Sequence, residues 1–151
     1  MIIIVDTNIA FSAILNTKSI IGDLVLNSDG IFEFWSCHYL LEEIDKHWDK
    51  LKKISKFGDS VLIESQRLIY KNINFINEGQ IPKIHRLQAY NLVKDIDIDD
   101  IVFIALNEFQ KSILWTGDKI LISGLKSIGY DKVISTDELV KLRKGLEKKA
   151  L

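Results

Sequence analysis

The feature that most constrains the fold is a run of four β-branched residues near the start of the chain, Ile2, Ile3, Ile4 and Val5, which Asp6 follows directly. β-Branched residues favour strands, and an apolar run without alternation is typical of a strand buried on both faces. Such strands occur in parallel sheets that helices cover on both sides. A carboxylate at the end of a buried strand is costly unless it is paired or bound to a cation. Asp6 is therefore a candidate functional residue.

Strand and helix patterns alternate along the rest of the chain. Further strands are predicted over residues 31–35, 112–115 and 132–134. Helices are predicted over residues 8–15, from residue 20 after a Ser19 cap, and over residues 39–53, 60–72, 83–93 and 97–109. Ser135 and Glu138 form a capping box for a final helix. Strands separated by helices predict an α/β sandwich with a mostly parallel sheet. The length of 151 residues predicts one domain over residues 1–151.

Composition narrows the expected class of protein and its location in the cell. Hydrophobic residues make up 47% and charged residues 27%, a balance typical of globular proteins. The apolar stretches are too short for a membrane span, and the first residues lack the basic segment of a signal peptide. Cys37 is the only cysteine, which fits a reducing compartment and predicts a cytoplasmic location without a membrane partner. The net charge of −1, with lysines clustered over residues 46–56 and 141–149, neither supports nor excludes an RNA ligand.

Acidic residues follow two predicted strands and lie near the start of two predicted helices. They are Asp6, Asp118, the cluster of Asp97, Asp99 and Asp100, and the pair Glu42 and Glu43. Ligand sites in parallel sheets form at the carboxyl ends of the strands. Carboxylates that converge there repel one another unless a cation compensates them, and oxygen ligands favour Mg²⁺ or Mn²⁺. Such a site activates water and stabilises phosphoryl transition states.

Each acidic residue also has a simpler interpretation. Asp97, Asp99 and Asp100 could serve only as a helix cap and as charges that complement the helix dipole, and Asp118 could belong to a plain turn. Helical phase separates the two glutamates. At about 100° per residue, Glu43 lies roughly 110° and Glu42 about 150° from the centre of the apolar stripe, so Glu43 is predicted to face inward.

Four segments, taken in order, resemble the motifs of PIN domains. They are residues 3–8 (IIVDTN), 41–44 (LEEI), 97–106 (DIDDIVFIAL) and 114–119 (LWTGDK), and the resemblance covers about residues 1–137. It implies a three-layer Rossmann-like sandwich with a short, mostly parallel central sheet. It also implies Mg²⁺- or Mn²⁺-dependent hydrolysis of RNA phosphodiester bonds through an acidic active site.

Carried over by position, the resemblance implies specific residue roles. The implied catalytic residues are Asp6, Glu43, Asp100 and Asp118, with Asp6, Asp100 and Asp118 as metal ligands. Thr7, Asn8 and Thr116 match positions that orient carboxylates through hydrogen bonds, and Asp97 lies one turn before the main ligand on a similar face. VapC-type toxins belong to the same family, so the resemblance also raises an antitoxin protein and a homodimer as partners besides RNA.

Two other classes of protein place an acid after the first strand. Phosphatases of the haloacid-dehalogenase kind need a second Asp two residues later, where this chain has Asn8. Receiver-like modules end the first strand with paired acids, whereas Thr7 and Asn8 follow Asp6 here. A non-catalytic metal- or RNA-binding module stays open as the alternative, and a ribonuclease is the leading hypothesis.

Overall fold

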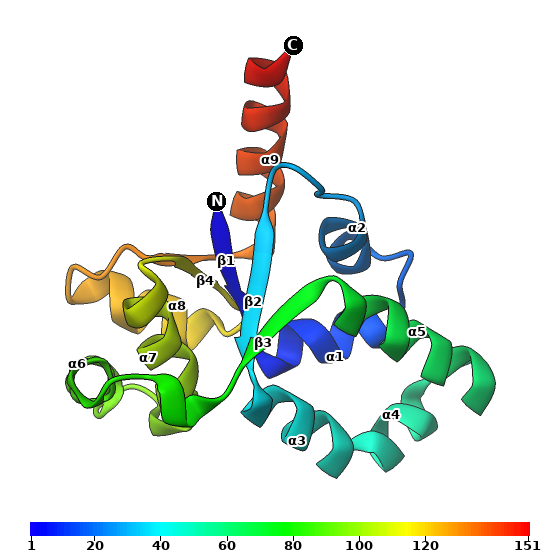
Figure 1. The fold of residues 1–151 in the computed structure, drawn as a ribbon, viewed down its shortest axis with the longest axis horizontal. Coiled ribbons are helices and arrows are strands. Elements are labelled where there is room, and N and C mark those ends of the chain that lie inside the picture. Colours follow the sequence, from blue (N-terminus) through cyan, green and yellow to red (C-terminus); the bar gives the residue numbers. More distant parts are fainter.

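The computed structural model describes residues 1–151 and is built on a five-stranded sheet of order β3-β2-β1-β4-β5 (Figure 1). Its strands are β1 (Ile2–Val5), β2 (Glu33–Cys37), β3 (Ile73–Ile76), β4 (Ile113–Trp115) and β5 (Val133–Ile134). Every neighbouring pair is parallel. Parallel strands must be joined by crossovers that cover the sheet. The predicted α/β sandwich is therefore confirmed, and its sheet is wholly parallel.

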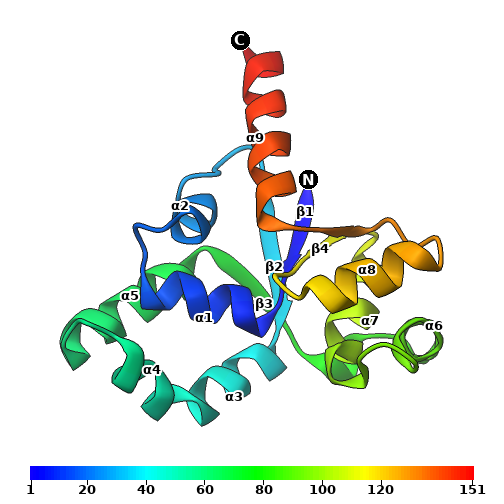
Figure 2. The ribbon, with the colours of Figure 1, turned by 180° about the vertical axis from the view of Figure 1, so that it is seen from behind.

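Helices cover both faces of this sheet. One group is α1 (Thr7–Leu15), α2 (Ile20–Leu26), α3 (His38–Lys46), α4 (Trp48–Ile54) and α5 (Asp59–Lys71). The other is α6 (Lys83–Val93), α7 (Ile101–Gln110) and α8 (Lys119–Ser127), with short 3₁₀ helices η1 (Glu78–Gln80) and η2 (Ile98–Asp100) beside it. Figures 1 and 2 show the two groups on opposite sides of the strands and α9 (Thr136–Ala150) projecting from one end. The result is a three-layer sandwich.

Strand order determines where a ligand site can form. The chain begins in the central strand β1, moves outward through β2 to β3, and then returns to β4 on the other side of β1. The crossovers therefore leave β1 and β4 on opposite faces of the sheet, which opens a crevice at the carboxyl ends of these two strands. Asp6 directly follows β1, and Asp118 follows β4 after two residues.

The core explains why the first strand is an unbroken apolar run. Ile3, Ile4 and Val5 have no solvent exposure, because helices pack on both faces of β1. Leu114 and Trp115 of β4 are equally buried.

No single helix is long and apolar enough to cross a membrane, and only α1 and α2 together, bent by 102°, reach that length and composition.

Two predictions about local structure need correction, and two elements were not predicted. The helix predicted over residues 39–53 is two helices, because His47 takes backbone angles of φ −103° and ψ 15° that end α3, and α4 begins at Trp48. The second strand lies two residues later than predicted. Two elements that the sequence did not predict are the edge strand β3, whose apolar pattern Asn74 interrupts, and the helix α8, which Asp118 caps.

Candidate active site

A cavity of about 210 Å³ lies at the carboxyl ends of β1 and β4. Its walls come from the start of α1, the inner face of α3, the η2–α7 junction and the turn after β4. The lining residues are Asp6, Thr7, Asn8, Glu43, Asp97, Asp99, Asp100, Phe103 and Asp118. All the acidic residues that the sequence analysis singled out therefore meet here, except Glu42, and Thr116 lies buried behind the wall.

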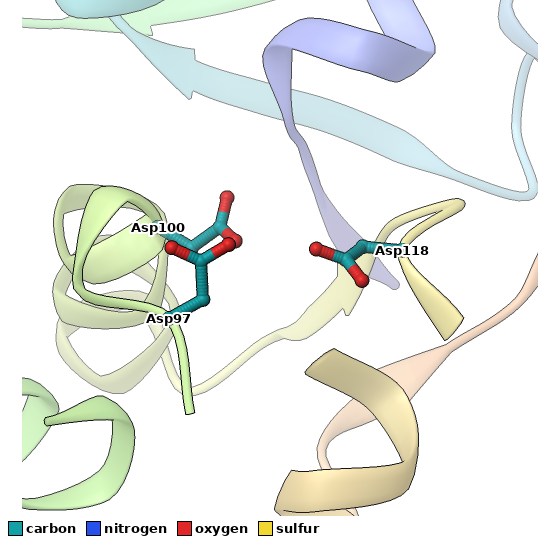
Figure 3. Close-up of side chains that lie close together, drawn as sticks. All are labelled: Asp97, Asp100 and Asp118. Carbon is teal, nitrogen blue, oxygen red and sulfur yellow. The ribbon is translucent and has the colours of Figure 1, made fainter. Parts of the chain in front are cut away.

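Three carboxylates converge most closely in this cavity. Asp97, Asp100 and Asp118 each offer an oxygen within 4.8 Å of the oxygens of the other two. Figure 3 shows Asp97 and Asp100 on the η2–α7 segment and Asp118 on the turn after β4, with their carboxylates facing one another across the gap. Such a set of oxygen donors fits a hard divalent cation such as Mg²⁺ or Mn²⁺.

Asp6 lies deeper than this set, at the base of the cavity. It is 3% exposed, and its Oδ1 accepts a hydrogen bond of 2.9 Å from the backbone N–H of Ile9, which caps α1. Burial raises the pKa of the Asp6 carboxyl from 3.8 to about 6. Hydrogen bonds from Thr116 and Ile9 counteract part of that rise, whereas the charges of Asp118 and Glu43 add to it.

Asp100 differs from Asp6, Asp97 and Asp118 because its carboxylate does not cap a helix. It occupies the N-cap position of α7 but makes no side-chain capping bond. Burial, together with the charges of Asp6, Asp97 and Asp118, raises its pKa from 3.8 to about 7. A carboxyl group that resists ionisation among like charges becomes ionised readily when a cation joins it. The electrostatics of the cavity therefore favour a positively charged ligand.

Glu43 faces the cavity, and Glu42 lies outside it. The Thr7 hydroxyl donates a hydrogen bond of 2.5 Å to Glu43 Oε1, which ties α1 to α3. Asn8 is exposed at the rim. Thr116 is fully buried, and its Oγ1 accepts a hydrogen bond of 3.1 Å from the Asp118 backbone N–H. Its hydroxyl also lowers the pKa of the Asp6 carboxyl.

Two lining residues were given no specific role by the resemblance. Asp99 was a candidate of the acidic cluster, but Asp100 was preferred because the apolar run over residues 101–106 follows it directly. Phe103 follows Asp100 by three residues, so helical spacing places both on one side of α7. In the sequence, an aromatic residue in an apolar stripe looks the same whether it lines a cavity or packs in the core. Phe103 could therefore not be predicted as a lining residue.

A family model described as "PIN domain" matches residues 4–144. This chain belongs to the PIN-domain family. The match includes every lining residue of the cavity, from Asp6 to Asp118. A solved structure of VapBC2 from Rickettsia felis, bound to a DNA fragment from the promoter, contains a chain that is similar to this PIN domain. The two chains are 15% identical with a TM-score of 0.66, over 89% of this chain and 98% of that chain. No sequence among curated proteins matches this PIN domain significantly.

Proposed function

We propose that this PIN domain is a divalent-metal-dependent ribonuclease. The observation that carries the proposal is the convergence of Asp97, Asp100 and Asp118 above the buried Asp6, at the strand ends where parallel α/β folds bind ligands. Membership of the PIN family supports a hydrolase that acts on nucleic acids. RNA as the substrate and Mg²⁺ or Mn²⁺ as the ion are the further content of the proposal.

Asp100 and Asp118 would hold the ion together with the deeper Asp6, which lines the same cavity, and Asp97 lies close enough to Asp100 and Asp118 to share it. When bound, a divalent cation polarises a phosphate and lowers the pKa of the attacking water. Hydrogen bonds from backbone N–H groups hold three of these carboxylates in place before any ion binds. Asp118 accepts from the backbone N–H groups of Ile120 and Leu121 at 3.0 and 3.1 Å, and Asp6 and Asp97 each accept from a backbone N–H. Side chains fixed in this way lose little freedom when they bind.

Glu43 is suited to take a proton from the attacking water. Thr7 holds one of its carboxylate oxygens and leaves the other available to the cavity. Water then forms a new bond to phosphorus, and the bond to the 3′-oxygen breaks. The proton from the water goes first to Glu43, and the leaving oxygen gains one from solvent. The expected products carry a 5′-phosphate and a 3′-hydroxyl.

The test is cleavage of single-stranded RNA by the purified protein with Mg²⁺, Mn²⁺ or EDTA. We expect cleavage with either ion, none with EDTA, and none by Asp6→Asn or Asp100→Asn. Asp131→Asn is the matched control, because Asp131 is exposed and outside the cavity. Equal cleavage by wild type and Asp6→Asn would indicate a contaminating nuclease. RNA binding without cleavage with any divalent ion would show a binding module instead.

We further propose that the protein is the toxin of a toxin–antitoxin pair. The support is the similarity in fold to a chain of the VapBC2 structure and the resemblance to VapC-type toxins. Expression should arrest growth, and a protein encoded beside it should restore growth and copurify with it. A homodimer, which light scattering of the purified protein would detect, and a cytoplasmic location stay predictions.

A further inference from the structure

A second groove adjoins the active-site cavity between α3, η1 and the start of α7. It measures about 360 Å³, within the range of about 300–1,000 Å³ typical of small-ligand pockets. Its lining includes Tyr39, Glu42, Glu78, Ile98, Asp99 and Val102. Asp99 lines both the groove and the cavity. We call it the Tyr39 groove.

An aromatic pair lies between the active-site cavity and the Tyr39 groove. Phe103 lines the active-site cavity and Tyr39 lines the groove, and the centroids of their rings lie 6.0 Å apart. Tyr39 also lies near Glu43, whose charge adds to the effect of burial in raising the pKa of the Tyr39 hydroxyl. Because Asp99 lines both spaces and this aromatic pair lies between them, a base held in the groove would adjoin the active-site cavity.

The apolar part of the groove suits a flat ring. Ile98 is 48% exposed, and Val102 and the Tyr39 ring lie along the same hollow. An exposed isoleucine beside a half-buried tyrosine offers a surface against which a planar ligand can stack. Protein sites for unpaired RNA bases commonly combine an aromatic or apolar platform with hydrogen bonds to the base edge.

The charged residues of the groove determine which edge of a planar base could bind there. Glu42, Glu78 and Asp99 line it, and no lysine or arginine does, so a phosphate would be repelled. Glu78 is already engaged, because it accepts from the Tyr39 backbone N–H and holds η1 against α3. Glu42 is exposed and forms none of the ion pairs of the chain. Asp99 is also outside those ion pairs but lines the active-site cavity as well, so Glu42 is the unpaired carboxylate that belongs to the groove alone and can accept from a ligand with N–H donors.

We propose that the Tyr39 groove binds a nucleobase beside the cleaved phosphate and that Glu42 makes it select guanine. This inference rests on the proposed ribonuclease function. Guanine presents two adjacent donors, N1–H and the 2-amino group, which match the two oxygens of a carboxylate. An ionised carboxylate only accepts hydrogen bonds, so uracil and adenine present a poorer edge.

The test compares kcat/KM for RNA oligonucleotides that differ only in the base next to the cleaved bond. We expect the wild type to prefer guanine on the order of 10-fold, the size that one bidentate contact gives. Replacing that guanine by inosine, which lacks the 2-amino group, should remove most of the preference. Glu42→Gln should cleave the guanine and inosine substrates at similar rates. Ile98→Ala should raise KM for all bases.

A matched control is Glu64→Gln, because Glu64 is exposed on α5, far from the groove in sequence and in the fold. It should keep the full ratio between guanine and inosine. A wild-type enzyme without base preference, or an unchanged ratio in Glu42→Gln, would overturn the groove assignment while leaving the ribonuclease in place. Loss of binding to a basic partner protein without any change in base preference would assign the groove to that protein instead. Absence of all cleavage, with Asp6→Asn equal to wild type, would refute the ribonuclease itself.

Discussion

Asp6→Asn should make the metal-free protein more stable while abolishing its activity. Asp6 is buried at the base of an acidic cavity, so its charge is unfavourable whenever no cation is present. Asparagine has almost the same shape and is an equally good N-cap, so the bond from the Ile9 N–H should survive. The change therefore removes a charge and leaves the local structure of α1 intact.

The size of the gain in the free energy of unfolding follows from the pKa of Asp6. Burial raises the pKa of Asp6 from 3.8 to about 6, so the folded state holds its proton more tightly than the unfolded state. The contribution of Asp6 to the free energy of unfolding is thus complete below pH 3.8, falls as the pH rises to about 6, and is constant above. A difference of about 2.2 units, at about 1.36 kcal/mol each, corresponds to about 3 kcal/mol. The asparagine amide needs new acceptors, so we expect a net gain of about 2 kcal/mol.

The assay is urea denaturation in EDTA, followed by far-ultraviolet circular dichroism. The difference between variant and wild type should be close to zero near pH 4 and reach about 2 kcal/mol near pH 8. This corresponds to a rise in Tm of roughly 4–8 °C for a chain of this length. With Mn²⁺ the order should reverse, because the wild type gains stability by binding and the variant does not. A variant that is less stable than wild type at high pH in EDTA would refute the reasoning.

Three further predictions concern the same chain. Mn²⁺ affinity should increase by up to about tenfold per pH unit below the Asp100 pKa of about 7 and level off above it, as calorimetry would show, because the ion competes with a proton. Thr7→Val should lower kcat on the order of 10-fold without changing Tm by more than a few degrees, since it removes the hydrogen bond that holds Glu43 Oε1; an unchanged kcat would contradict this role. Ser135→Ala should destabilise the protein by about 1 kcal/mol in denaturation experiments and leave cleavage unchanged, because it removes the capping box of α9.

Some of the site could be predicted from sequence, because strand ends and helix starts are local signals. The unbroken apolar run before Asp6 and the helical phase of Glu43 both placed their side chains correctly in the cavity. Asp97 was expected one turn away, in a supporting position. The 3₁₀ geometry of η2 instead brings it into the set with Asp100 and Asp118, whereas Asp6 lies outside that set. A tighter turn changes which side chains share a face, and residue spacing alone does not reveal it.

The two interpretations of the acidic residues, as helix caps or as ligands of a cation, prove compatible. Asp6, Asp97 and Asp118 each use one oxygen to accept from a backbone N–H at the start of a helix, so the second oxygen of each is not needed for capping. In a parallel sheet every strand end leads toward a helix start, so capping residues of neighbouring units meet at one edge. The partial positive charge of those helix starts also offsets part of the repulsion among the carboxylates. Capping therefore fixes three of the carboxylates in place. Asp100 has no capping bond, and its pKa is raised to about 7, so a bound cation would favour its ionised form most.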